Sequence, residues 1–164
     1  MLKANKSKSF RASGARFAIV ASQYNGRYVD AMVGAAQAEL NKARALKVEL
    51  FRVPGAYEVP LAAARLARRS SELPATAPGH YDAIICLGVI LRGETVHAAH
   101  IGEAVSAALM KLQLRYEIPL IHEVLLLENE QQAQARCLSR THNRGTEAAQ
   151  TAIAMAGLMA RLNT

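Results

Sequence analysis

The sequence has few cysteines, few aromatic residues and no long hydrophobic run. Its 164 residues include only Cys86 and Cys137, far apart in apolar surroundings, which argues for reduced core thiols and against a disulfide framework. With 5% aromatic residues and no tryptophan, it lacks stacking platforms for single-stranded nucleic acid. The longest apolar run, Ala83 to Leu91, has nine residues, whereas a membrane-spanning helix needs about 20. No secretory signal peptide is expected, and we predict a cytoplasmic protein.

The net charge of +7 is concentrated near the N-terminus. Residues 1–16 contain five basic side chains and no acidic one, which leaves 15 basic and 13 acidic side chains in the rest of the chain. The globular part is therefore nearly neutral. A basic Ser/Lys tail can be a disordered terminus, a contact for nucleic acid or a short organellar leader. We expect a disordered tail over 1–16 and one domain over 17–164, and we do not expect nucleic-acid binding.

Apolar patterns predict an alternation of strands and helices. Runs typical of buried strands occupy 17–22, 48–53, 81–88 and 120–127. Helical patterns occupy 29–40, 60–69, 101–112, 131–138 and 148–159, with a Pro- and Gly-containing loop over 70–80. Strands that are apolar throughout, each followed by a helix, imply a parallel sheet covered on both faces. The predicted fold is α/β, a flavodoxin-like three-layer αβα sandwich with a four-stranded parallel sheet.

Ligands of such sheets bind beyond the carboxyl ends of the strands, which selects the loops 23–26, 54–58, 88–97 and 126–130. The loop over 88–97 is predicted to enter a helix at about Thr95. Free backbone N–H groups would then converge near Gly93, Glu94 and Thr95 and could bind phosphate. A glycine turn that only connects strand to helix is the alternative. Glu94 stands where a P-loop requires lysine, which argues against an NTPase.

His97 falls in the first turn of the helix predicted after this loop. A helix N-terminus disfavours a charged imidazolium, so we expect a neutral ring that can accept a proton. A surface or capping histidine is an alternative interpretation. His100 and Glu103 follow at helical spacing and leave a metal site open, but no strong zinc spacing is present, and we expect no metal.

Two arginines and the lysine positions bear on the chemistry. Arg136 and Arg144 follow the fourth strand and could bind phosphate through two hydrogen bonds each, or could be solvated helix residues. All six lysines, at positions 3, 6, 8, 42, 47 and 111, miss the carboxyl ends of the strands. A Schiff base with an enzyme lysine is therefore not expected, and any imine must use an amine of a substrate.

The sequence leaves the roles of four further side chains open. Glu58 could bind the hydroxyls of a polyol or cap a helix, and Tyr24 could stack on a planar ring or cover the sheet edge. His122 and Glu123 interrupt an apolar strand and point to opposite faces. Because a buried ionisable group needs a partner, one of them should reach the pocket or a subunit contact.

Several motifs at matching spacing resemble the lumazine synthase family of riboflavin biosynthesis. The resemblance runs from about Phe17 to Leu162. It rests on Val53-Pro-Gly-Ala-Tyr-Glu-Val-Pro60, Gly88-Val-Ile-Leu-Arg-Gly-Glu-Thr-Val-His97, Glu128-Asn129, Gln132-Ala133 with Arg136, and Asn143-Arg-Gly-Thr-Glu-Ala-Ala149. The first two segments together are highly specific.

The resemblance implies a transferase that condenses 5-amino-6-(D-ribitylamino)uracil with 3,4-dihydroxy-2-butanone 4-phosphate, releasing phosphate and water, without a cofactor. A non-catalytic flavin- or lumazine-binding module on the same fold is the alternative. The resemblance further implies a homo-oligomer built from pentamers, with active sites between subunits, and riboflavin synthase as a candidate partner.

The same resemblance assigns roles to individual residues. It implies His97 as the proton-transfer residue and Arg136, with the Glu94–Thr95 backbone, as the phosphate site. Arg144 stands where the family usually has lysine, and His122 and Glu123 stand where it often has an aromatic or apolar residue and glycine. The substrate-binding residues it implies are Tyr24, Asn25, Ala56, Tyr57, Glu58, Val89, Ile90, Leu91, Gly93, Glu94, Thr95, His122, Arg136 and Arg144.

Overall fold

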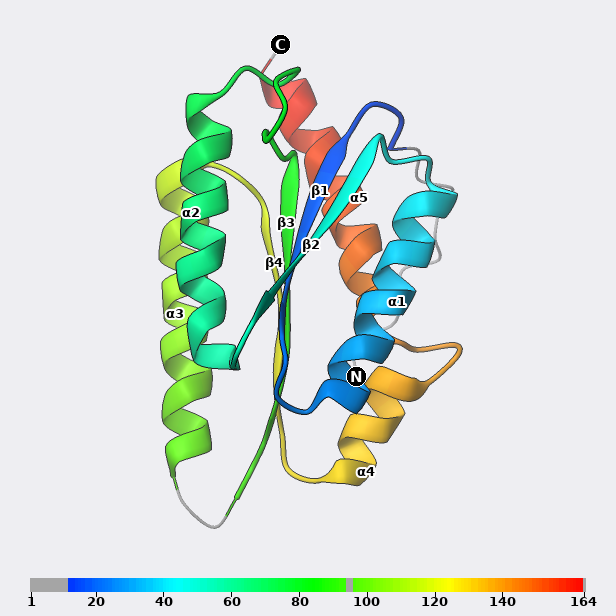
Figure 1. Cartoon of the computed structure of the whole chain (residues 1–164), viewed down its shortest axis with the longest axis vertical. Helices are drawn as coiled ribbons and strands as arrows, with labels where there is room; N and C mark the ends of the chain where they lie inside the picture. Colours follow the sequence, from blue (N-terminus) through cyan, green and yellow to red (C-terminus); the bar gives the residue numbers. More distant parts are fainter. Residues whose placement is uncertain (1–11, 94–95, 164) are drawn as a thin grey trace.

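The structure, a computed structural model, describes residues 12–93 and 96–163. Strands alternate with helices along the chain (Figure 1), and η1 is a short 3-10 helix while η2 is a π-helix. The elements are β1 (Arg16–Ser22), α1 (Gly26–Lys42), β2 (Lys47–Val53), η1 (Ala56–Glu58), α2 (Val59–Glu72), β3 (Ala83–Leu91), α3 (His97–Tyr116), β4 (Leu120–Leu127), α4 (Glu130–Ala133), η2 (Gln134–Leu138) and α5 (Arg144–Leu162).

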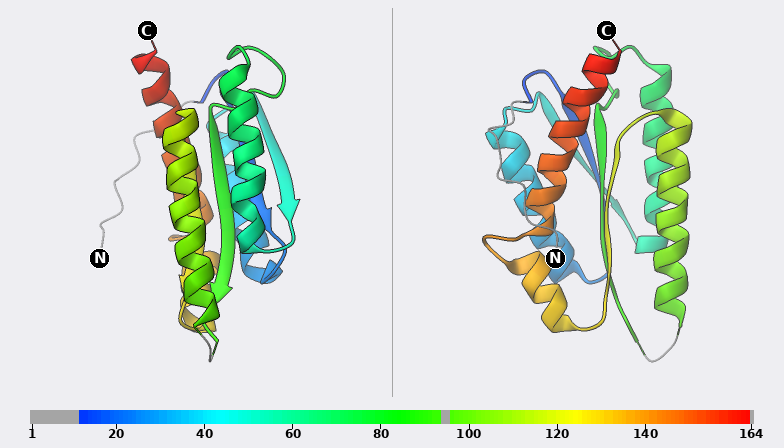
Figure 2. Two further views of the ribbon diagram at one scale, coloured as in Figure 1. Left: turned by 90° about the vertical axis from the view of Figure 1, so that its left-hand side faces the viewer. Right: turned by 180° about the vertical axis from the view of Figure 1, so that it is seen from behind.

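The four strands form one parallel sheet in the order β2-β1-β3-β4. The two middle strands are almost entirely buried, as their continuous apolar sequences predict. Helices α2 and α3 cover one face of the sheet, and α1 and α5 cover the other (Figures 1 and 2). The predicted three-layer α/β sandwich with a four-stranded parallel sheet is confirmed.

The sheet separates two hydrophobic cores. Alternate residues of β1 belong to one core and then to the other, because successive side chains of a strand point to opposite faces. Phe17 and Ile19 pack on the side of α1 and α5, whereas Ala18 and Val20 pack on the side of α2 and α3. All four side chains are fully buried. Both faces of β1 are therefore covered by packed apolar side chains.

Helix α2 packs on the sheet through a narrow stripe of mostly small residues. Helix α2 buries Val59, Ala63, Ala67 and Ser70, about one residue per turn. It continues to Glu72, so the loop predicted from residue 70 begins only at Leu73. Within the residues that the structure describes, no helix is long and apolar enough to cross a membrane.

The third strand is also longer than the sequence predicted. Residues 89–91 pair with residues 125–127 of β4, so the loop expected over 88–97 begins only after Leu91. Gly88 lies inside β3, so it is not part of the loop, whereas the phosphate site predicted near Gly93, Glu94 and Thr95 stays a prediction. A Cβ on Gly88 would lie 3.1 Å from Cγ1 of Val124 and 3.3 Å from Oγ of Ser22, so glycine permits close packing here.

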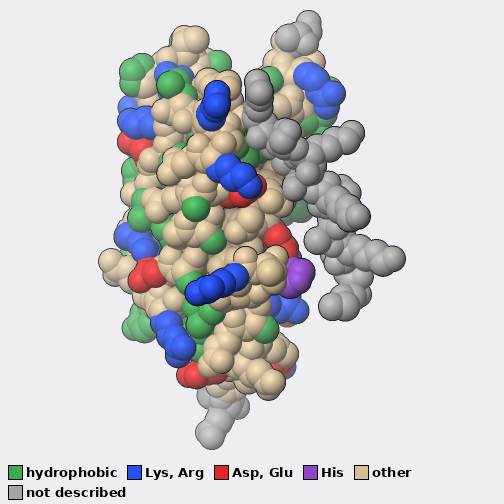
Figure 3. All heavy atoms as spheres, turned by 90° about the vertical axis from the view of Figure 1, so that its right-hand side faces the viewer, with side chains coloured by type: hydrophobic (Ala, Val, Ile, Leu, Met, Phe, Trp, Pro, Cys, Tyr) green, Lys and Arg blue, Asp and Glu red, His purple; other side chains and the backbone are tan. Residues whose placement is uncertain are grey.

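The folded domain begins earlier than the predicted boundary at Phe17. Ala12 is buried, and its N–H donates to the carbonyl of Ala43 at 2.8 Å, while Ser13 forms an isolated bridge with Ala45. These contacts attach residues 12–15 to the end of α1, whereas residues 1–11, with most of the predicted basic tail, lie outside the described residues. Over the face shown in Figure 3, basic and acidic side chains are interspersed.

The start of α5 lies very close to α1. A Cβ built on Gly145 would lie 2.0 Å from the backbone oxygen of Met32 in α1. Only hydrogen fits at this point, so Gly145 fixes how closely the start of α5 approaches α1. The side chain of Asn143 holds the same turn, because its Oδ1 accepts from the Gly145 N–H at 2.8 Å and its Nδ2 donates to the carbonyl of Cys137.

We predict that Gly145→Ala destabilises the fold by about 3 kcal/mol or more, because the added methyl group collides with rigid backbone. Gly157→Ala is the matched control on the same helix, since a Cβ there meets no atom within 4 Å. The control should be neutral or stabilising by up to about 1 kcal/mol through helix propensity. Chemical unfolding of the two variants checks the prediction, and equal stabilities would contradict it.

Candidate active site

A hollow of about 280 Å³ opens at the carboxyl ends of the strands, the lower edge of the sheet in Figure 1. Its walls come from the loop after β1, from η1 and from the end of β3. The lining residues are Tyr24, Asn25, Gly55, Ala56, Tyr57, Glu58, Val89, Ile90, Leu91 and Ile101. Eight of these were predicted as substrate-binding residues from the sequence, and the structure brings those eight together.

Asn25 joins the first loop to the third strand. It adopts a left-handed backbone conformation with φ of 55°, which asparagine tolerates better than most residues. Its Nδ2 donates to the backbone carbonyl of Val89 at 2.7 Å, and its own carbonyl accepts from the N–H groups of Tyr28 and Val29. Asn25 thus begins α1 and fixes the loop 23–26 against β3 beside the hollow.

Two tyrosine rings stand at the rim of the hollow. Tyr24 is 74% exposed and Tyr57 is 64% exposed. The N–H of Tyr24 donates to the carbonyl of Pro54 at 3.2 Å, which anchors its backbone while the ring stays in solvent. Of the two interpretations of Tyr24, covering the sheet edge is therefore wrong. The ring is free to stack on a planar ligand.

Glu58 closes the turn that follows β2. Its Oε2 accepts from the backbone N–H of Gly55 at 2.9 Å, so the capping interpretation is correct. A Cβ on Gly55 would lie 2.9 Å from the same oxygen, so a larger residue here would require the Glu58 side chain to shift. A carboxylate has two oxygens, so Glu58 can hold the turn with one and accept a ligand hydroxyl with the other.

His97 is the first residue of α3 and is exposed beside a second hollow of about 490 Å³. This second hollow also contacts His100 and Ala104, and it shares Tyr57 and Ile101 with the first. The imidazole thus lies next to the space enclosed by Tyr24 and Glu58. Within residues 12–93 and 96–163, no three His, Cys, Asp or Glu side chains group in a way that could hold a metal ion.

A salt bridge ties the ends of β3 and β4 together under the loop that leads to His97. Nη1 of Arg92 lies 2.9 and 3.0 Å from the two carboxylate oxygens of Glu128, and the Arg92 N–H donates to the carbonyl of Leu127. The sequence did not reveal this pair, although the strand register places the two residues opposite each other. Gly93 is exposed just beyond it, whereas Glu94 and Thr95 lie outside the described residues.

Arg136 and Arg144 lie on the other side of the sheet. Arg136 is exposed on η2, and Arg144 begins α5, in the layer that contains α1. His97 and the two hollows lie at the opposite layer, with α2 and α3. Neither arginine lines the hollows of its own chain.

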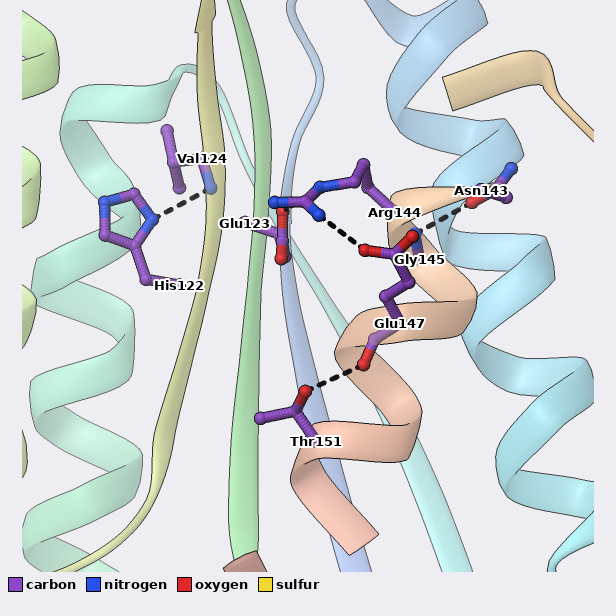
Figure 4. A network of polar contacts seen from close by, with 8 residues as sticks. All are labelled: His122, Glu123, Val124, Asn143, Arg144, Gly145, Glu147 and Thr151. Carbon is purple, nitrogen blue, oxygen red and sulfur yellow. Dashed lines mark hydrogen bonds and ion pairs between the residues drawn. The ribbon is translucent and has the colours of Figure 1, made fainter. Parts of the chain in front are cut away.

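His122 does not line these hollows either, because its ring is bound to α3. The backbone N–H of Val124 donates to its Nδ1 at 3.1 Å (Figure 4), so the ring proton belongs on Nε2. Nε2 lies 2.7 Å from Oγ of Ser106, which donates in turn to the carbonyl of Gly102. Burial lowers the pKa of His122, and both ring nitrogens are therefore satisfied in the neutral form.

Glu123 points the opposite way, toward α5, as the strand alternation predicts (Figure 4). Its carboxylate lies 3.1 Å from Nε of Arg144, and Nη1 of the same arginine donates to Glu147. Burial raises the pKa of Glu123 to about 7, although Arg144 opposes the shift. The expected partner of this ionisable group on β4 is therefore Arg144 within the same chain.

Comparison with known proteins assigns these features to a family. The sequence model of the 6,7-dimethyl-8-ribityllumazine synthase family matches residues 14–160. A protein of that name from Stenotrophomonas maltophilia is 37% identical over 150 residues, covering 90% of this chain and 91% of the relative. Another from Xanthomonas euvesicatoria pv. vesicatoria is 36% identical over 151 residues, covering 91% of this chain and 92% of the relative.

We predict that Asn25→Asp destabilises the protein by about 1–3 kcal/mol at neutral pH, because a carboxylate cannot donate to the Val89 carbonyl and repels it. Aspartate has nearly the same size and also tolerates a positive φ, so the donor is the main change. Below about pH 4 the protonated side chain can donate again, and the difference from the wild type should narrow. Unfolding at the two pH values measures both effects, and equal stability at neutral pH would contradict the prediction.

Proposed function

The chain belongs to the 6,7-dimethyl-8-ribityllumazine synthase family and is a transferase of riboflavin biosynthesis, and we propose how its residues carry out that reaction. The enzyme condenses 5-amino-6-(D-ribitylamino)uracil with 3,4-dihydroxy-2-butanone 4-phosphate. A non-catalytic binding module is not favoured, because the relatives that match nine-tenths of the chain are named as synthases. Cytoplasmic location and riboflavin synthase as a partner stay predictions.

The reaction needs an amine, proton transfers and a departing phosphate. The 5-amino group of the pyrimidine attacks the ketone and forms an imine with loss of one water. Phosphate then leaves, and the ribityl-bearing nitrogen closes the ring with loss of a second water. No lysine lines either hollow, so the substrate's own amine forms the imine.

We assign the pyrimidine to the hollow formed by the loop after β1, by η1 and by the end of β3. The exposed ring of Tyr24 would stack on the pyrimidine, and the backbone of residues 89–91 would run along its edge. The ribityl chain would extend past Ala56 and Tyr57 to the carboxylate of Glu58. This hollow, next to a histidine at the start of a helix, is the observation that carries the proposal.

His97 is the proposed proton-transfer residue. Its exposed imidazole adjoins the space assigned to the pyrimidine, where it can take a proton from the attacking amine and return one as water or phosphate leaves. Acid–base catalysis of this kind contributes about 10²–10⁴-fold in rate. Holding the two small reactants in contact can contribute up to about 7–11 kcal/mol more, so positioning is the larger part of the work.

The phosphate site is proposed to combine two subunits. The backbone of residues 93–95 would contribute from the loop beside His97, whereas Arg136 and Arg144 would come from a second copy, because both lie on the far layer of their own chain. We therefore propose a homo-oligomer built from pentamers with active sites between subunits, where His122 of the second copy also borders the site. Exposed apolar side chains support such contacts, among them Met110, Leu114, Leu126, Leu158 and Leu162.

We predict that His97→Ala slows turnover by about 10²–10⁴-fold and leaves thermal unfolding unchanged, because the side chain is exposed and acts in proton transfer. Lumazine absorbance and phosphate release, corrected for the reaction without enzyme, give the rate. His100→Ala removes the other imidazole of the same hollow and should change the rate only a few-fold. An unchanged rate in the His97 variant would remove His97 from the mechanism.

We predict that Arg136→Ala mainly raises the KM for the butanone phosphate, with a smaller effect on the KM for the pyrimidine. The lost contact is a charge-assisted hydrogen bond, for which an increase of about tenfold or more is typical. Arg140→Ala is the matched control, because it removes an exposed arginine just beyond η2. Equal KM values for the two variants would contradict the assignment of Arg136.

Co-assembly of the His97→Ala and Arg136→Ala proteins tests whether sites are shared. If the two residues of one site come from different subunits, about a quarter of the interfaces in an equal mixture regain both wild-type side chains. With the butanone phosphate held well below the KM of the Arg136→Ala protein, activity should then exceed that of either variant alone. No recovery from a mixture that has demonstrably exchanged subunits would show that each site lies within one chain.

A further inference from the structure

Arg144 is held between two carboxylates at the start of α5. Glu123 reaches it from β4 and is only 12% exposed, while Glu147 reaches it from the next turn of the helix (Figure 4). The backbone of this turn is fixed by Asn143 and by the contact of Gly145 with Met32. Because the backbone cannot shift, the two carboxylates decide where the guanidinium lies.

The position of Arg144 is electrostatically unfavourable without these carboxylates. The N-terminus of a helix carries a partial positive charge, which repels a cation in the first turn. Burial alone would lower the pKa of Arg144, but Glu123 and Glu147 more than offset it, so its pKa lies above the usual value. The arginine therefore stays charged, and its field depends on whether Glu123 is ionised.

The titratable groups near Glu123 come from two elements. Arg144 and Glu147 belong to α5, while Arg136 and Cys137 belong to η2. Burial raises the pKa of Cys137 to about 11, so this thiol stays neutral, and the residue of β3 opposite Glu123 is the uncharged Leu87. With Glu123 ionised, two carboxylates balance the two arginines. With Glu123 protonated, the group carries one net positive charge.

We propose that Glu123 is a positioning residue that holds Arg144 against the sheet and sets how strongly this surface attracts the phosphate of the substrate. The inference rests on the proposed function, in which Arg136 and Arg144 meet the phosphate. An ionised Glu123 competes with the phosphate for the guanidinium of Arg144. Protonated Glu123 has no charge and no longer competes for Arg144. Phosphate binding therefore strengthens as the pH falls through about 7.

Glu123→Gln tests the proposal, because glutamine keeps the shape of the side chain and loses its charge. At pH 8 we expect the KM for the butanone phosphate to fall about three- to tenfold, with kcat nearly unchanged. At pH 6, where Glu123 of the wild type is mostly protonated, the two proteins should have similar KM values. Ionisation of the substrate phosphate is common to both proteins, so the ratio of their KM values isolates Glu123.

Three further measurements sharpen the test. Inhibition by inorganic phosphate should strengthen in parallel in the Glu123→Gln protein, and Glu123→Asp, which keeps the charge, should restore a wild-type pH profile. Glu72→Gln is the matched control, since Glu72 also pairs with an arginine, Arg68, but lies on α2 at the other layer. Its KM ratio to the wild type should stay near unity at every pH.

An unchanged or increased KM for Glu123→Gln at pH 8 would overturn the role of Glu123. If Arg136→Ala still raises the KM in that case, the phosphate assignment itself stands. If neither Arg136→Ala nor Arg144→Ala alters the KM, the phosphate assignment has failed, and the role of Glu123 fails with it. The two failures are thus distinguishable by the arginine variants.

Discussion

All four strands of the sheet are parallel, and this pairing decides where the loops that follow them lie. Because every strand runs the same way, the loops that follow β1, β2, β3 and β4 all emerge at one edge of the sheet. The hollow lies at this edge, where three links join neighbouring groups: Asn25 to Val89, Glu58 to Gly55, and Arg92 to Glu128. The first two of these links involve residues that line the hollow.

The sheet also separates the chemistry into two halves. The face with α2 and α3 carries the hollow proposed for the pyrimidine and His97, and the face with α1 and α5 carries the arginines. Helices pack on both faces of the sheet, and neither Arg136 nor Arg144 lines the hollows of its own chain. In the proposed assembly, each site takes its two halves from two copies, so dilution or interface damage would lower activity without altering any residue that contacts substrate.

Much of this arrangement could be predicted from the sequence. Continuous apolar strands and periodic helices indicated the fold, and the rule for parallel sheets indicated the loops that form the hollow. The end of β3 was misplaced because Gly88 resembles a loop residue, whereas its role is close packing against Val124 and Ser22. The pairs Arg92–Glu128 and Glu123–Arg144 were missed because opposite charges far apart in sequence become partners only through strand register and helix packing.

The outer edge of β4 has one more consequence. This strand lies at the edge of the sheet. Three backbone N–H groups on the outer side of β4 and of the residue after it donate to side chains: Leu120 to Gln113, Val124 to His122 and Glu128 to Gln132. An open edge strand is a template on which a foreign strand can add and begin a fibril. Here three of the outward N–H groups already have acceptors and cannot pair with an added strand. Copies of this alanine-rich chain can therefore lie close together at high concentration without extending their sheets into one another.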